Sequence, residues 1–127
     1  MPASMTGTVP SSDVQVTKDG FLFIDPTKFA FDVAADLPPE QAKYMADSQM
    51  PVAEAAFDTA VTVAAWRDKP TYGIVATDDR VLNPKPARWM YKRSRAKVSE
   101  VKASHLVYIS HPDAVARVIE TAACAVK

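Results

Sequence analysis

Glycine is scarce in this chain of 127 residues, which holds three: Gly7, Gly20 and Gly73. A dinucleotide-binding fingerprint, a phosphate-binding P-loop and the Gly-x-Ser-x-Gly turn that exposes a nucleophilic serine all need clustered glycines. Three glycines spread this widely exclude each of these motifs from the 127 residues.

Cysteine and histidine are also scarce, with one cysteine, Cys124, and two histidines, His105 and His111. A single cysteine excludes an internal disulfide framework and any zinc site built from several cysteines. Two histidines leave few ligands for a histidine-based metal centre. We therefore expect neither a metal nor another cofactor.

An excess of charge of one sign is lacking as well, because fifteen acidic side chains balance fifteen basic ones. This balance argues against attraction of the whole molecule to nucleic acid or to a membrane surface. No apolar run approaches the length of a membrane span, and residues 1–13 have neither the basic start nor the apolar stretch of a signal peptide. We expect a cytoplasmic protein with neither nucleic acid nor membrane as a partner.

The residues that are present, 48% hydrophobic and 24% charged, are typical of a folded domain. Residues 1–13 show no periodicity and predict a flexible tail. Apolar and polar residues alternate on both sides of Gly20, which predicts a hairpin over residues 14–24. Asp25-Pro26 then has the pattern of a helix N-cap followed by proline at the first helical position.

Short helices dominate the next stretch. Pro38-Pro39 opens a helix over residues 40–49, Pro51 ends it, and residues 53–60 predict another short helix. No long strand is expected in this stretch.

A change in charge divides the chain near residue 62. Residues 11–60 carry nine acidic and three basic side chains, whereas residues 66–102 carry ten basic and four acidic ones. We therefore expect two units, residues 14–62 and residues 63–127, that dock on each other through opposite charge.

The second unit alternates strand and helix patterns, which is typical of a parallel sheet covered by helices. Its last helix follows a capping sequence, Ser110-His111-Pro112-Asp113, and carries an apolar stripe at helical spacing. The predicted elements are a strand over 72–77, a helix over 84–96, a strand over 97–101 and the final helix with Val115, Val118, Ile119 and Ala122 on one face.

Asp79 and His105 each follow one of the two predicted parallel strands. The carboxyl ends of parallel strands meet at one edge of a sheet, so a carboxylate and an imidazole are expected side by side there. Such a pair orients a histidine that activates a nucleophile. The alternative from spacing alone is that Asp79 caps the helix near Pro84 and His105 is an ordinary loop residue.

Three segments decide between these interpretations: "YGIVATDDRVLNP", "RWMYKR" and "KVSEVKASHLVYISHPDAVARVIE". Together they resemble the C-terminal end of an α/β-hydrolase, close to a small-cap bacterial esterase group related to plant-esterase and hydroxynitrile-lyase-like enzymes. The upstream segment "DGFLFIDPTKFAFDVAADLPPEQAKYMADSQMPV" resembles the cap of that group. The resemblance covers residues 14–124.

The resemblance implies an α/β fold, namely an incomplete α/β-hydrolase with a helical cap over residues 14–62 and two C-terminal βα units over residues 63–127. It implies that Asp79 is the acid and His105 the base of a Ser-His-Asp triad acting on a small-molecule ester. The serine, its Gly-x-Ser-x-Gly turn and the oxyanion-hole loop are absent from the 127 residues. We therefore expect a truncated hydrolase that is inactive alone. The chain departs from the family again at Ser94-Arg95, where a glycine usually ends the helix.

Other candidate residues favour structural roles. Among possible nucleophiles, Ser104 shares a loop with the histidine, and Cys124 is expected to be buried in the last helix. The large side chains Met45, Met50 and Phe57 are expected either to line an acyl or alcohol pocket or to form the core of the cap. The remaining residues assigned to structure are Ser48 and Ser110 as helix or cap residues, His111 as a first-turn residue, Trp66 and Trp89 as packing residues, and the basic Lys92, Arg93, Arg95 and Lys97 as a solvated helix turn.

An interpretation from a different class is a non-catalytic binding or interaction module. Two strands make a poor sheet, and the free edge of the strand over residues 72–77 invites pairing with another chain. The partner would be a separately encoded N-terminal half, which restores an enzyme, or a second copy of this chain. The sequence does not distinguish between possible substrates, or between hydrolase and lyase outcomes.

Overall fold

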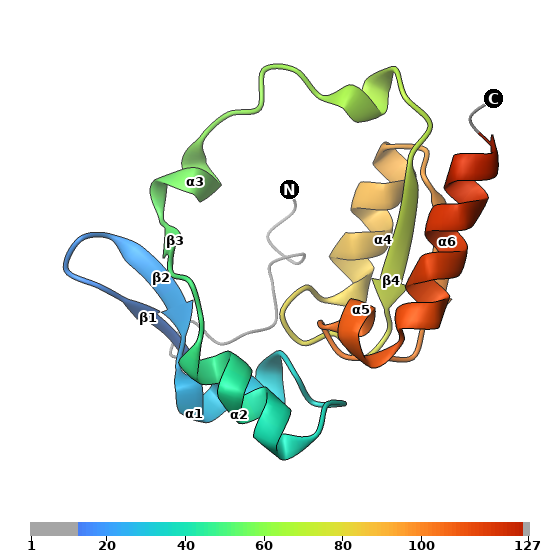
Figure 1. Ribbon diagram of the computed structural model, residues 1–127. Helices are drawn as coiled ribbons and strands as arrows, with labels where there is room; N and C mark the ends of the chain where they lie inside the picture. The colour runs from blue at the N-terminus through green and yellow to red at the C-terminus, as the bar shows by residue number, and fades with distance from the viewer. Residues whose placement is uncertain (1–12, 126–127) are drawn as a thin grey trace.

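A computed structural model describes residues 13–125 and divides them into two groups of elements (Figure 1). A small antiparallel sheet and a pair of short helices form the first group, and a pair of parallel strands flanked by helices forms the second. A long connection, residues 59–71, arches between the two groups and contains one turn of 3₁₀ helix, Ala65–Arg67.

The antiparallel sheet begins with the predicted hairpin. Strand β1 (Val14–Val16) pairs with β2 (Phe21–Ile24), and Gly20 in the turn between them has a φ of 77°. This left-handed conformation is readily adopted by glycine because glycine has no Cβ. A two-residue strand that the sequence pattern did not predict, β3 (Val52–Ala53), pairs with β2 on its other side.

The two helices of the first group are α1 (Pro26–Asp32) and α2 (Pro39–Asp47), which pack against each other. Asp25 caps α1 as expected, because its carboxylate accepts a hydrogen bond of 2.8 Å from the Thr27 amide. The largest buried apolar cluster lies here. Its members are Phe29, Val33, Ala34, Ala42, Ala46 and, from the far end of the chain, Leu106.

The parallel pair consists of β4 (Tyr72–Ala76) and β5 (Lys97–Val101), joined through α4 (Pro84–Arg93). The register places Tyr72 opposite Lys97 and Ala76 opposite Val101. Gly73 lets α4 approach the strand, because a Cβ at this position would lie 2.4 Å from the ring of Tyr91. The last helix, α6 (Pro112–Ala125), contacts β4 but contains no fully buried residue.

Three expectations about these elements were wrong. The helix expected over residues 53–60 shrinks to α3 (Ala55–Asp58), since β3 takes its first residue. A short helix, α5 (Val107–Ser110), precedes α6, so Ser110 ends one helix and does not cap the next. Cys124, expected to be buried, is exposed, because α6 has only the narrow pair β4–β5 to cover it.

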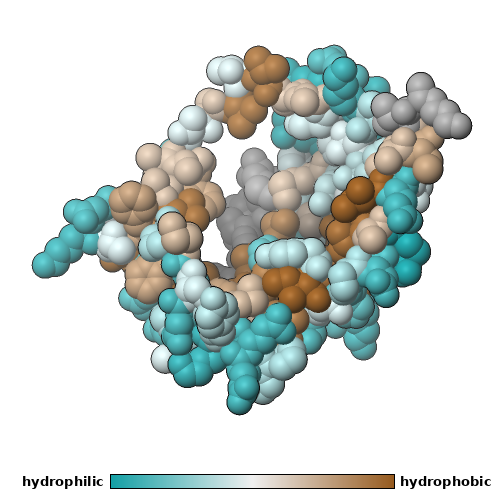
Figure 2. Space-filling model, in the orientation of Figure 1, coloured by the Kyte–Doolittle hydropathy of each residue, from teal (hydrophilic) through white to brown (hydrophobic). Residues whose placement is uncertain are grey.

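Apolar surface remains exposed around the second group and the connection. Val61 is 77% exposed, Val63 is 84% exposed, and Ile119 of α6 is 62% exposed. Figure 2 shows apolar residues on the connection and beside α6. Among the described residues, β4 pairs only with β5, and the hairpin belongs to the other sheet.

Candidate functional site

Asp79 lies in the turn directly after β4. The hydrogen-bond ladder runs past the ends of both strands, since the Thr77 amide donates to Val101 and the Asp78 amide donates to Ala103. One carboxylate oxygen of Asp79 accepts hydrogen bonds from the amides of Val81 at 2.8 Å and Leu82 at 2.9 Å. The side chain is 10% exposed. The turn that follows Asp79 therefore fixes its carboxylate locally.

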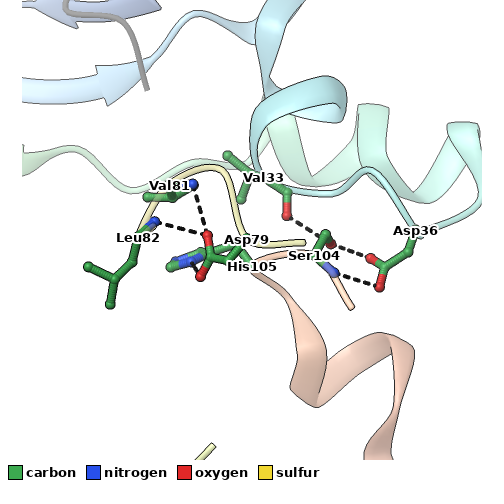
Figure 3. A network of polar contacts seen from close by, with 7 residues as sticks. All are labelled: Val33, Asp36, Asp79, Val81, Leu82, Ser104 and His105. Carbon is green, nitrogen blue, oxygen red and sulfur yellow. Dashed lines mark hydrogen bonds and ion pairs between the residues drawn. The ribbon is translucent and has the colours of Figure 1, made fainter. Parts of the chain in front are cut away.

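The second carboxylate oxygen of Asp79 lies 2.9 Å from Nδ1 of His105 (Figure 3). An ionised carboxylate only accepts hydrogen bonds, so Nδ1 of the imidazole must carry the proton. In the neutral ring, Nε2 is then left as a proton acceptor. The structure thus brings Asp79 and His105 together at one edge of the parallel pair, as expected, in the arrangement that prepares a histidine to act as a general base.

The alternative role for Asp79, as a cap of the following helix, belongs to another residue. Asn83 caps α4, and its side-chain oxygen accepts a hydrogen bond of 3.0 Å from the Lys85 amide. Asp79 is thereby available for the histidine.

His105 borders a cavity of about 460 Å³. The large side chains of the first unit were expected either to line a pocket or to form the core of the cap, and they do both. Met50 and Phe57 line this cavity, whereas Met45 packs against the buried cluster of α1 and α2. The cavity is lined mainly by apolar side chains and is open to solvent, since Met50 is 86% exposed and Phe57 is 72% exposed. The other lining residues are Val14, Leu22, Phe23, Ile24, Gln49, Val52 and Val81.

The hydroxyls of two serines, Ser104 and Ser48, are occupied as hydrogen-bond donors. Ser104 is 3% exposed and its hydroxyl is bonded to Asp36, while the hydroxyl of Ser48 is bonded to the Tyr44 carbonyl oxygen. The hydroxyl of Ser110 lies 2.9 Å from Nδ1 of His111. His111 therefore contacts Ser110, and its Nδ1 also lies 3.9 Å from the Asp36 carboxylate.

Arg93, the last residue of α4 and a member of the basic cluster, packs on two aromatic rings. The guanidinium of Arg93 lies 5.2 Å from the ring centre of Trp66 and 5.9 Å from that of Trp89. Both tryptophans are thus packing residues for arginine, which agrees with the structural role expected for them. Arg95 has a φ of 54°, the conformation for which a glycine is favoured, as its position in the family pattern predicted.

Sequence reasoning missed one residue near the site, Asp36 in the loop between α1 and α2. Its carboxylate bonds the amide and hydroxyl of Ser104, the residue before His105. The two partners are 68 positions apart, so no local pattern links them. The strand-end pattern and the family motif both pointed to the loop of Ser104 and His105, but neither signal reached Asp36.

The described residues lack two kinds of feature, a membrane-spanning helix and a metal-binding cluster. Within residues 13–125, every helix falls short of the length and apolar character needed to cross a bilayer. The same residues contain no cluster of three or more histidine, cysteine, aspartate or glutamate side chains able to hold a metal ion.

Comparison with known proteins identifies the family to which the chain is similar. The model of the alpha/beta hydrolase family matches residues 3–118. A comparison with curated proteins gives no match.

Two solved structures are similar to the chain. Polyneuridine aldehyde esterase matches with a TM-score of 0.72 and 18% identity over 92% of this chain and 49% of that one. A pyrethroid hydrolase matches with a TM-score of 0.61 and 25% identity over 86% of this chain and 46% of that one. The chain thus spans about half the length of these structures. With its parallel pair, its covering helices and a family match over most of its length, the chain belongs to the alpha/beta hydrolase family.

Proposed function

We propose that this chain supplies the acid and base of an ester-hydrolysing active site whose serine nucleophile comes from outside the 127 residues. The observation that carries the proposal is the hydrogen bond of 2.9 Å between Asp79 and Nδ1 of His105, which leaves Nε2 as a proton acceptor. The esterase and hydrolase named among the similar structures support ester chemistry.

In the proposed reaction, Nε2 of His105 takes the proton of the serine hydroxyl as the serine attacks the ester carbonyl. The same nitrogen returns the proton to the departing alcohol and then activates a water that hydrolyses the acyl-enzyme. Asp79 holds the imidazole tautomer and stabilises the imidazolium. Residues 14–62 serve as the cap, and the cavity with Met50 and Phe57 receives an apolar part of the ester.

The first test uses the purified chain with short p-nitrophenyl esters. We expect no turnover above background, because the serine and the oxyanion hole are missing from the 127 residues. One oxyanion-hole donor alone is worth about 2.7–4 kcal/mol of barrier lowering. Turnover that vanishes in His105→Ala would contradict the need for an external nucleophile.

The second test restores the missing half by co-expression with a polypeptide that carries Gly-x-Ser-x-Gly and is encoded directly upstream. We expect ester hydrolysis that falls about 10⁴-fold in Asp79→Asn, since the wrong tautomer of His105 is then favoured. Asp47→Asn is the matched control, because Asp47 is exposed and pairs only with Lys43. Hydrolysis that persists in His105→Ala would refute the proposed role.

A second candidate function is a non-catalytic interaction module. It is favoured by the open edge of β4 and by the exposed Val61 and Val63 on the connection. Unpaired strand edges of this kind bind other strands. Light scattering at micromolar concentration tests this candidate: oligomers or a co-purifying partner, without His105-dependent ester hydrolysis, fit an interaction module, and a monodisperse monomer with a cooperative melt contradicts it.

A further inference from the structure

His105 is held between two buried neighbours. Leu106, which is 6% exposed, belongs to the apolar cluster formed by α1 and α2. Ser104, which is 3% exposed, is bonded to the loop between the same two helices. The imidazole between these neighbours is 37% exposed and is turned toward Asp79. The chain on either side of the ring is therefore anchored on the α1–α2 pair.

The polar half of this anchor is the carboxylate of Asp36. One of its oxygens accepts a hydrogen bond of 2.9 Å from the Ser104 amide, and the other accepts one from the Ser104 hydroxyl. Nδ1 of His111 lies 3.9 Å from the same carboxylate. In Figure 3 this group lies beside the Asp79–His105 pair, with Ser104 directly adjacent to the histidine.

The Asp36 carboxylate is suited to this role because it stays charged. Burial acts to raise the pKa of Asp36, but the hydrogen bonds from Ser104 and Ser110 outweigh it and hold the pKa below the ordinary aspartate value. Hydrogen bonds to an ionised acceptor are roughly twice as strong as neutral ones. The charged groups Asp78, Arg80 and Lys102 line the same cavity of about 460 Å³ as Asp36, so they are the neighbours that any titration of this site must consider.

The two members of the Asp79–His105 pair are held in different ways. Asp79 is fixed by amides two and three residues further along the chain. His105 has no comparable local support: Ser104, just before it, is held by a residue 68 positions earlier. The position of the imidazole thus depends on a contact between the two groups of elements.

We propose that Asp36 is a positioning residue for His105, acting through Ser104 to keep Nδ1 aimed at Asp79. Its bearing on catalysis rests on the proposed function, but the positioning itself does not. The α1–α2 pair then has a task besides covering a substrate cavity: it sets the tautomer and direction of the histidine before any nucleophile is present.

The test is nitrogen–proton correlation spectroscopy of the imidazole in the full chain. In the wild type, we expect one tautomer of His105, protonated on Nδ1, with a hydrogen-bonded proton signal far downfield. Asp36→Asn removes the charge while keeping the side-chain size, and we expect loss of the downfield signal and mixing of the two tautomers. Ser104→Ala keeps the amide contact but loses the hydroxyl, so we expect a partial loss.

The matched control is Asp25→Ala, which removes the cap of α1 within the same pair of helices but does not touch Ser104. We expect this variant to be less stable and yet to retain the wild-type His105 spectrum. If Asp36→Asn does not fold, Ser104→Ala decides alone. A wild-type spectrum in the folded variants of Asp36 and Ser104 overturns the proposal, as does a mixed tautomer in Asp25→Ala.

This experiment separates the positioning role from the proposed function. Loss of the single tautomer in Asp36→Asn, together with failure of the co-expressed halves to hydrolyse esters, keeps the positioning role and removes the esterase. Ester hydrolysis that depends on His105 but is unchanged in Asp36→Asn, with an unchanged spectrum, does the reverse.

Discussion

The two groups of elements bury their apolar side chains to different extents. The α1–α2 pair encloses a continuous apolar cluster that includes Leu106 beside the candidate histidine. The parallel pair has a few buried residues, such as Val75 and Ala87, while four of the five residues of β5 are exposed. The better packed group is therefore the one that carries neither Asp79 nor His105, and it stabilises the site through contacts made across the chain.

The largest expected difference between the two groups comes from truncating one apolar side chain in each. Leu106→Ala leaves a cavity in the enclosed cluster, and we expect a loss of about 2–5 kcal/mol in the free energy of unfolding. Ile119→Ala on the exposed face of α6 should change it by less than about 0.5 kcal/mol. Urea denaturation of both variants measures this, and equal losses would show that the parallel group is packed as well as the other.

A smaller effect is expected inside the parallel group, where Gly73 lies against the ring of Tyr91. Gly73→Ala places a methyl group against the ring of Tyr91, so the ring or α4 has to shift, at a cost of about 1–3 kcal/mol. The double variant with Tyr91→Ala removes the clash, so its loss should be smaller than the sum of the two single losses. Additive losses in denaturation experiments would mean that the ring and the strand do not touch.

Arg95 offers a change in the opposite direction. Arg95→Gly relieves a positive φ that costs a side-chain residue about 1–2 kcal/mol, against an entropy penalty of about 0.4–1 kcal/mol in the unfolded chain. We expect a net stabilisation below about 1 kcal/mol. Gly20→Ala, at a φ of 77°, is the mirror experiment and should destabilise the hairpin. A lower melting temperature for Arg95→Gly would contradict this account.

The finest comparison lies between two carboxylates of the α1–α2 group. Burial and the neighbouring Asp13 raise the pKa of Asp32, with Arg80 and Lys28 acting against them, whereas the pKa of Asp36 is lowered. The folded state thus binds the Asp32 proton more tightly than the unfolded chain does, and this contribution to stability is lost as pH rises through the raised pKa. The contribution of Asp36 is present above the ordinary aspartate range and is lost as pH falls through its lowered pKa.

The dependence of melting temperature on pH therefore distinguishes the contributions of Asp32 and Asp36. On acidification from neutral pH, we expect a gain from Asp32 before the loss from Asp36 begins. Asp32→Asn should abolish the gain and retain the loss. A pH profile identical to that of the wild type would show that the Asp32 carboxyl is not shifted by its surroundings.

The local parts of this structure could be predicted from the sequence. The hairpin at Gly20, the cap at Asp25, strands β4 and β5, and helices α4 and α6 follow from patterns within a few residues of one another. Asp79 and His105 were found because strand ends in a parallel sheet share an edge, and the family motif added weight. The exposed position of Cys124 was missed because the periodicity of a helix shows which face is apolar, but not whether anything covers it.

The contacts between distant segments could not be predicted. Strand β3 is two residues long and exists because β2 offers it an edge. Asp36 has an ordinary loop sequence, and only the folded chain places it against Ser104. Both depend on where other segments arrive in space, which one sequence without relatives does not specify.

An insertion in the chain has different effects on the Asp79–His105 contact depending on whether it lies before β4 or just after the ends of β4 and β5. Asp79 lies three positions after Ala76 and His105 lies four positions after Val101, and Ala76 and Val101 form the last pair of the ladder. One inserted residue in either short span displaces its side chain by about 3.3 Å, which is enough to separate the carboxylate from the imidazole. Insertions in the exposed connection of residues 59–71 precede the ladder and leave both spans unchanged. Variation in length is thus tolerated ahead of β4 and forbidden just beyond the ends of β4 and β5.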